Sequence, residues 1–141
     1  MPLFQRTVIS KYLNHQNKEL ISSKWESYSK YFHNIEIQNN IKALKEEDFQ
    51  EGFIRELFVN IMGFVLNPMP NFNFVLEKKN VDDSRKADGA IIFDNKVKAV
   101  VELKATNTTD LGKVETQAFG YKNNHPDCVY VITSNFEKLR F

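Results

Sequence analysis

The sequence has almost no cysteine and no long apolar run, and each shortage excludes a class of protein. Its single cysteine, Cys128, cannot form a disulfide within the chain, so we expect a reducing compartment. No segment reaches the roughly 18 consecutive apolar residues of a membrane span. Residues 1–6 lack the basic-then-apolar pattern of a signal peptide. These absences predict a soluble cytoplasmic protein without a membrane partner.

A glycine-rich phosphate loop and an excess of basic residues are also missing. The first absence disfavours nucleotide hydrolysis. The 19 Lys and Arg residues stand against 18 Asp and Glu residues, which gives a formal net charge of +1. A nucleic-acid-binding domain often carries a basic excess, so composition alone does not indicate DNA binding.

What the sequence does contain is typical of one globular domain over residues 1–141. Hydrophobic residues make up 42% of the 141 positions and charged residues 26%. Residues from about 4 to 64 favour helices, the second of two running from about Lys45 to Met62 and ending near Gly63. Two apolar stripes at helical spacing are interpreted as the packing faces of these helices: Trp25, Tyr28, Phe32 and Ile35, then Phe49, Phe53, Leu57 and Ile61.

The part from about residue 72 to 141 predicts a sheet with one helix. Strands are expected from residue 72, at 90–93 and at 97–104, with a turn at 82–85 after the first. A helix over 111–123 is expected to be capped by Thr109 or Asp110 and to bury Leu111, Val114, Ala118 and Tyr121. A last strand at 129–132 is apolar enough to be buried on both faces. The prediction is an α/β domain with a mixed sheet in the order β-β-β-α-β, flanked by helices.

Polar side chains interrupt the strongest strand at its end. Alternation places Val97, Ala99, Val101 and Leu103 on one face, and Glu102 and Lys104 on the other. If residues 94–96 form a three-residue hairpin loop, Asp88 lies directly opposite Glu102 with the Cβ atoms about 5 Å apart. A two-residue loop would instead put the two acids on opposite faces of the sheet.

Two carboxylates that close repel each other unless a cation or a proton lies between them. Oxygen ligands without His or Cys favour Mg²⁺, Mn²⁺ or Ca²⁺ over zinc. Next to such a cation, Lys104 would orient an attacking water or stabilise the charge of a phosphoryl transition state. The spacing leaves a second interpretation open, in which Asp88, Glu102 and Lys104 form a salt-bridge cluster at the end of a strand.

The spacing of Asp88 and, fourteen positions later, Glu102-Leu103-Lys104 resembles the PD-(D/E)xK superfamily of restriction endonucleases. The stretches 86–91, 101–104 and 115–121 are similar to the amino-terminal nuclease region of type IIG restriction–modification enzymes. The likeness extends to 46–53 and 131–141 and so covers nearly the whole chain. Ala87 stands where many members of the superfamily have proline.

The resemblance implies a role for each residue of the motif. Asp88 and Glu102 would be metal ligands together with the main-chain carbonyl of Leu103, and Lys104 would be the catalytic lysine. An acid on the preceding helix completes such sites. Glu47 fits best by its distance from Gly63, and Glu51, one turn later, is the alternative.

A glutamine–tyrosine pair on the predicted helix 111–123 adds to the likeness. Gln117 and Tyr121 resemble a catalytic motif of some branches of the superfamily, although a polar pair packing that helix on the sheet is an equal alternative. Lys79, Arg85 and Lys86 flank the motif and are candidate phosphate contacts. An ordinary solvated edge explains these three nearly as well.

The implied function is a Mg²⁺-dependent (or Mn²⁺-dependent) endonuclease domain of a prokaryotic restriction–modification enzyme. It would cut double-stranded DNA to leave 5′-phosphate ends, with homodimerisation for cleavage of both strands. Type IIG enzymes also carry an adenine methyltransferase, which uses S-adenosylmethionine, and a target-recognition domain. This chain lacks the length for both, so we expect it to be a fragment of a longer chain whose other parts supply most DNA contacts. The alternatives are a repair or recombination nuclease of the same fold, and a catalytically idle module that binds DNA or protein.

Overall fold

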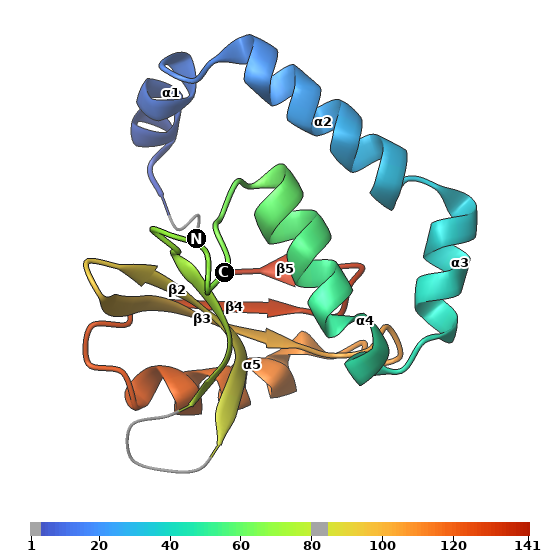
Figure 1. Cartoon of the computed structure of the whole chain (residues 1–141), viewed down its shortest axis with the longest axis vertical. Coiled ribbons are helices and arrows are strands. Elements are labelled where there is room, and N and C mark those ends of the chain that lie inside the picture. Colours follow the sequence, from blue (N-terminus) through green and yellow to red (C-terminus); the bar gives the residue numbers. More distant parts are fainter. Residues whose placement is uncertain (1–3, 80–84) are drawn as a thin grey trace.

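The computed structural model describes residues 4–79 and 85–141, and it has the predicted α/β architecture. A mixed sheet with strand order β1-β2-β3-β4-β5 lies between two helical layers. Figure 1 shows α4 and η1 on one face of the sheet, α5 on the other, and α1 to α3 as an arch farther out. The strands are β1 (Phe74–Lys79), β2 (Lys86–Phe93), β3 (Lys96–Leu103), β4 (Tyr130–Ser134) and β5 (Leu139–Arg140). The helices are α1 (Arg6–Asn14), α2 (Lys18–Phe32), α3 (Ile35–Ala43), α4 (Glu46–Phe53), the π-helix η1 (Ile54–Ile61) and α5 (Leu111–Asn123).

The predicted helix from Lys45 to Met62 is confirmed in extent but changes type halfway. α4 passes without a break into η1, where the Met62 N–H donates to the Leu57 carbonyl at 2.9 Å, five residues back. Gly63, with φ at +84°, ends the helix. The predicted stripe on this helix packs on the sheet, with Phe49, Phe53 and Leu57 buried.

The prediction for the first apolar stripe was wrong at both ends. Trp25 is 60% exposed and Ile35 is 72% exposed, while Tyr28 and Phe32 are half-buried. The four residues do not share a helix, because α2 ends at Phe32 and Asn34 caps a new helix, its side chain accepting from two N–H groups of α3. Residues at helical spacing therefore do not share a face when one helix ends and a new one begins between them.

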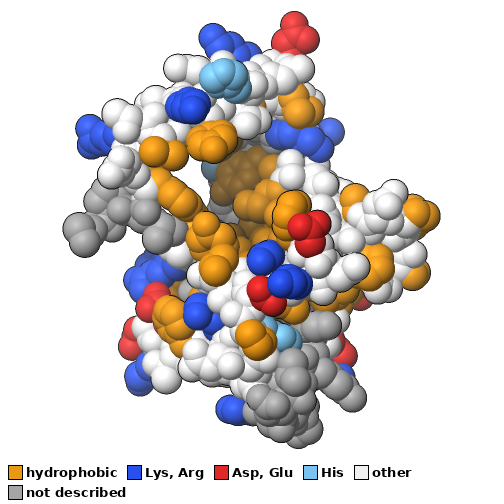
Figure 2. Space-filling model, turned by 90° about the vertical axis from the view of Figure 1, so that its left-hand side faces the viewer, with side chains coloured by type: hydrophobic (Ala, Val, Ile, Leu, Met, Phe, Trp, Pro, Cys, Tyr) orange, Lys and Arg blue, Asp and Glu red, His pale blue; other side chains and the backbone are white. Residues whose placement is uncertain are grey.

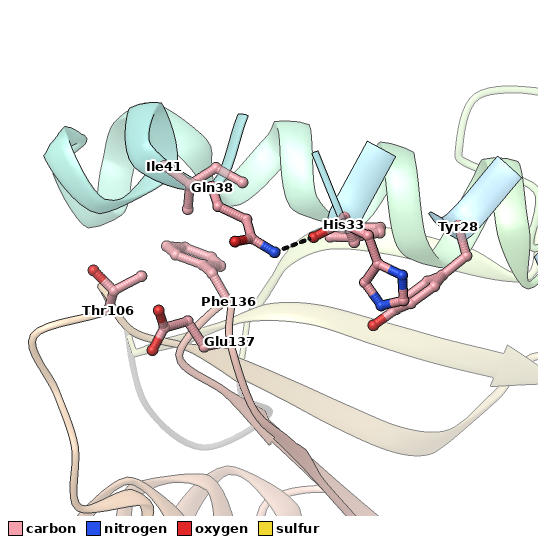
Figure 3. Close-up of a pocket in the computed structure, with 8 residues that line it drawn as sticks. Tyr28, His33, Gln38, Ile41, Thr106, Phe136 and Glu137 are labelled. Carbon is pink, nitrogen blue, oxygen red and sulfur yellow. Dashed lines mark hydrogen bonds between the residues drawn. The ribbon is translucent and has the colours of Figure 1, made fainter. Parts of the chain in front are cut away.

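The arch contacts the rest of the domain through α2 and α3. Lys24 in the middle of α2 donates to the Asn60 carbonyl of η1, and Lys42 on α3 pairs with Glu137. Figure 3 shows Gln38 donating to the Phe32 carbonyl, a 2.7 Å bond, beside a cavity of about 290 Å³ that Ile41 and Phe136 also line. Hydrophobic side chains gather around a hollow in the face that Figure 2 shows. Across the described residues, no helix combines the length and the apolar character needed to span a membrane.

The hairpin between β2 and β3 differs from the expected one, yet it gives the expected register. Its loop has two residues, Asp94 and Asn95, both with positive φ, and not the three that the sequence suggested. A bulge then restores the register: Ile92 pairs with Val97, but Ile91 pairs with Ala99. The extra residue is Lys98.

Two consequences follow from the bulge. Beyond it Gly89 pairs with Val101, so the same register places Asp88 opposite Glu102. Val97, predicted to share a face with Val101 and Leu103, packs instead with Val100 on the α5 side of the sheet. The bulge is the reason, since one extra residue reverses the alternation of side chains on one side of it.

The α5 helix follows the prediction closely. It covers Leu111–Asn123, the Asp110 side chain accepts from the Gly112 N–H, and the four predicted side chains are its buried ones. It connects β3 to β4, which run parallel. The expectation that β4 is buried on both faces holds only for its end. Val129 is 61% exposed and Tyr130 41%, because the two-residue β5 pairs only with Thr133 and Ser134.

Gly89, next to Asp88, is where the sheet admits no larger residue. A Cβ there would lie 2.7 Å from Cε1 and 2.8 Å from Cζ of the fully buried Phe74 ring. We predict that Gly89→Ala lowers the free energy of unfolding by about 1–3 kcal/mol, because the ring has no room to move. Gly120→Ala is the control: nothing lies within 4 Å of a Cβ there, and helix propensity predicts a gain of up to about 1 kcal/mol. Urea unfolding of both variants measures this, and equal stabilities would contradict it.

Candidate active site

The residues of the motif meet where β2 and β3 separate. The ladder between these strands ends at Gly89 and Val101, so the next free N–H of β3, that of Leu103, needs another acceptor. The Asp88 Oδ2 atom accepts from it at 2.7 Å. This bond places the Asp88 carboxylate beside Glu102, whose own side chain is buried at 2% exposure.

The Glu102 carboxylate is held by one of its two oxygens. Oε1 accepts from Lys104 Nζ at 2.8 Å and from Gln117 Nε2 at 2.6 Å, and Gln117 Nε2 also donates to the Tyr121 hydroxyl at 3.0 Å. The predicted pair on α5 thus contacts the predicted acid on β3. Oε2 is buried and accepts no hydrogen bond from the described residues.

The acid that α4 brings to this cluster is Glu46. Its Oε1 accepts from Lys104 Nζ at 3.2 Å and from Gln50 Nε2 at 3.2 Å, and Gln50 Nε2 lies 3.1 Å from Asp88 Oδ1. Gln50 therefore links the helix to β2. Sequence reasoning missed both residues, although their four-residue spacing at the start of a helix is a usable signal.

Glu47 and Glu51, the two acids considered for this position, form no hydrogen bond or ion pair with Asp88, Glu102 or Lys104 among the described residues, although both line the same cavity as Asp88. Glu47 is exposed, and it lines, together with Asp88, an open cavity of about 380 Å³. Glu51 forms an ion pair with Arg55 at 2.6 Å. Counting back from Gly63 assumed a regular α-helix, whereas the wider turns of η1 rotate the preceding residues about the helix axis.

The three candidate phosphate contacts are not gathered around Asp88. Lys86 is exposed and pairs with Glu77 at 2.9 Å, and Arg85 is also exposed. Lys79 lies opposite Lys86 in the β1–β2 register, but its side chain is outside the described residues. The predicted turn at 82–85 also falls mainly outside them, since residues 80–84 are not described.

Burial dominates the electrostatics of the two acids. It raises the pKa of Asp88 above its ordinary 3.8, and the Leu103 N–H and the Lys104 ammonium offset this only in part. Burial likewise raises the pKa of Glu102 to about 7, with further increases from the charges of Asp88 and Glu46 and a decrease from the hydrogen bond with Lys104. Burial lowers the pKa of Lys104, but its bonds and charge interactions with Glu102 and Glu46 outweigh this, so its pKa lies above 10.5.

The arrangement carries more negative than positive charge. When Asp88, Glu102 and Glu46 are ionised, Lys104 is the one ammonium bonded to them among the described residues. No three His, Cys, Asp or Glu side chains group as a metal-binding cluster in residues 4–79 and 85–141. Two carboxylates, one with an unpartnered oxygen, fit a hard cation that keeps several waters, such as Mg²⁺.

Comparison with protein-family models, with curated proteins and with solved structures finds no match for this chain.

The raised pKa of Glu102 predicts a pH-dependent stability in metal-free buffer. Between pH 4.5 and about 7 the folded protein binds a proton that the unfolded chain has lost, so stability falls as the pH rises through this window. The loss amounts to at most about 3 kcal/mol, with the same sign from Asp88. Glu102→Gln should be the more stable protein at pH 7.5 and should lose most of this dependence. Urea unfolding of both proteins at pH 5 and pH 7.5 measures it, and identical pH profiles would contradict it.

Proposed function

We propose that this chain is a divalent-metal-dependent DNA endonuclease domain of the PD-(D/E)xK type, which hydrolyses phosphodiester bonds. The observation that carries the proposal is the convergence of Asp88, Glu102 and Lys104 at the divergence of β2 and β3. A buried acid and a half-buried acid, both with raised pKa values, beside an ammonium bonded to the buried one are typical of a catalytic site more than of a surface ion pair.

Asp88 and Glu102 would hold the cation, with the Leu103 main-chain carbonyl as the third ligand that the family resemblance implies. Bound there, Mg²⁺ or Mn²⁺ supplies a Lewis acid for a phosphodiester oxygen and a bound water of lowered pKa. The chain's own residues prepare this site. Gln50 donates to Asp88, and Gln117 donates to Glu102, so both carboxylates are oriented from helices on opposite sides of the sheet.

Lys104 acts in this proposal as a fixed positive charge. Its bonds and charge interactions with Glu102 and Glu46 raise its pKa, so in this proposal it acts as an electrostatic stabiliser and as a donor to water. Its two acceptors, Glu102 and Glu46, come from the sheet and from α4. They hold the ammonium next to the carboxylates without saturating it, since an ammonium has three N–H donors.

The wider setting follows from the resemblance to type IIG enzymes. In this proposal the domain belongs to a prokaryotic, cytoplasmic restriction–modification enzyme and acts on double-stranded DNA. An adenine methyltransferase that uses S-adenosylmethionine and a target-recognition domain belong to the same enzyme, and two copies pair to cut both strands. The net charge of +1 supports this division, because the domain lacks the basic excess of an independent DNA-binding protein.

The main rival is a catalytically idle module, because the ion pairs of Lys104 would also be present in a structural cluster. A repair nuclease of the same fold would share the chemistry and differ in its DNA substrate. Cleavage measurements separate the idle module from both nucleases.

Plasmid cleavage tests the catalytic assignment. The purified chain is incubated in excess with supercoiled plasmid and Mg²⁺ or Mn²⁺, and nicking is followed on gels. We expect Asp88→Asn and Lys104→Met each to slow nicking by at least about 100-fold, because each removes charge from the transition-state environment. Asp48→Asn and Lys113→Met, which change the same residue types at exposed positions, are the controls. Equal nicking by the wild type and Asp88→Asn would overturn the assignment.

A matched pair of glutamates tests which acid α4 contributes. Glu46→Gln removes a charge bonded to Lys104 and Gln50, and we expect nicking to fall by roughly tenfold, as for other partners of catalytic groups. Glu47→Gln alters the next residue and should leave the rate within about twofold of wild type, as expected for an exposed surface substitution. The opposite ranking would assign the role of the helix acid to Glu47.

A further inference from the structure

Two buried side-chain oxygens lack a hydrogen-bond partner among the described residues. One is Oε2 of Glu102, which is 2% exposed, and the other is Oγ1 of Thr133, which is 1% exposed. A buried polar group without a partner is costly and is rare in folded proteins. A bound cation would explain the carboxylate oxygen alone. The threonine hydroxyl needs a partner of its own.

The two residues are neighbours in the sheet. Glu102 on β3 and Thr133 on β4 are register partners in a parallel pair, so their side chains leave the sheet on the same face. Both lie under α5: Glu102 accepts from Gln117, and Thr133 lines a cavity of about 410 Å³ together with Glu115 and Phe119. The Thr133 hydroxyl can donate a hydrogen bond, and the ionised Glu102 carboxylate can only accept one.

Backbone hydrogen bonds hold β3 and β4 together next to Glu102 and Thr133. The Lys104 N–H donates to the Ser134 carbonyl at 2.8 Å, which extends the β3–β4 pairing past the site. The Ser134 hydroxyl is already an acceptor, for the Phe136 N–H at 3.0 Å. Ser134 also points to the opposite face of the sheet, so Thr133 is the residue at this end of β4 whose hydroxyl lies on the face of Glu102. The branched Cβ of Thr133 restricts the hydroxyl to few orientations.

We propose that Thr133 is a positioning residue for Glu102. Oγ1 and Oε2 are not hydrogen-bonded to each other directly, so the hydroxyl donates to one buried water that in turn donates to Oε2, while Gln117 and Lys104 hold Oε1. Each carboxylate oxygen has two lone pairs, so Oε2 keeps one for a cation. The inference rests on the proposed function, because it makes Thr133 a support of the metal-binding carboxylate. β4 thus joins β2, β3, α4 and α5 in building the site.

Mn²⁺ binding to the 141-residue chain, measured by calorimetry without DNA, tests the inference. Thr133→Val keeps the shape of the side chain and removes the hydroxyl, and we expect it to weaken Mn²⁺ binding roughly tenfold. Thr133→Ser keeps the hydroxyl and should bind within about threefold of wild type. Unchanged affinity in Thr133→Val would overturn the inference and leave the proposed function standing. Equal weakening in both variants would assign the effect to packing and also overturn the inference.

The failure of the proposed function has a different signature. Absence of Mn²⁺ binding to the wild type, with no plasmid nicking, would overturn that proposal. Thermal unfolding in EDTA then still tests the water-mediated bond between Thr133 and Glu102. Loss of a satisfied hydroxyl in Thr133→Val should lower Tm by about 3–4 °C. A Tm equal to or above that of the wild type would mean that the hydroxyl has no partner and would overturn the inference.

Discussion

The buried carboxylate of Glu102 is the constraint around which the rest of this molecule is arranged. Removing a carboxylate from water is costly unless hydrogen bonds and opposite charge replace the lost solvation. Lys104 and Gln117 supply such contacts, but to one oxygen only, and the pKa of Glu102 still rises to about 7. The folded protein therefore retains a site that a proton or a cation stabilises. If the proposed function is right, the metal binds because the protein stabilises the charge of Glu102 only in part.

Every layer of the fold contributes to that environment. The sheet places Asp88 and Glu102 side by side, α5 covers Glu102 with Gln117, and α4 brings Glu46 to Lys104 and Gln50 to Asp88. The packing of Phe74 on Gly89 fixes β2 next to Asp88. Because stability and site geometry use the same residues, substitutions in this region change both, and variants need measurements of folding beside those of activity.

The sequence predicted the fold class, the α5 helix and the convergence of Asp88 with Glu102. The last of these predictions holds although the hairpin loop is one residue shorter than expected, because a bulge offsets the difference. A two-residue loop was expected to separate the acids, and the loop does have two residues. The bulge at Lys98 restores the register, and nothing in the alternation of this strand indicates a bulge. Glu46 and Gln50 were missed for a related reason, since the sequence pattern predicts a regular α-helix and does not indicate the π-helical hydrogen bonds of η1. Local periodicity therefore determined which elements form, whereas the irregular residues decided which side chains meet.

The near-zero net charge is the sum of a basic N-terminal part and an acidic C-terminal part, which overall composition does not distinguish. Up to Lys45 the chain has seven Lys and Arg residues against three Glu, and from Glu46 onward it has twelve basic residues against fifteen acids. The helical arch is therefore basic, and the part with the sheet and the candidate site is acidic. An acidic site repels a phosphodiester backbone, and a divalent cation between Asp88 and Glu102 would reverse that local repulsion. On the proposed function, the metal is thus needed for the DNA to approach as well as for its cleavage, while the basic arch provides attraction at longer range.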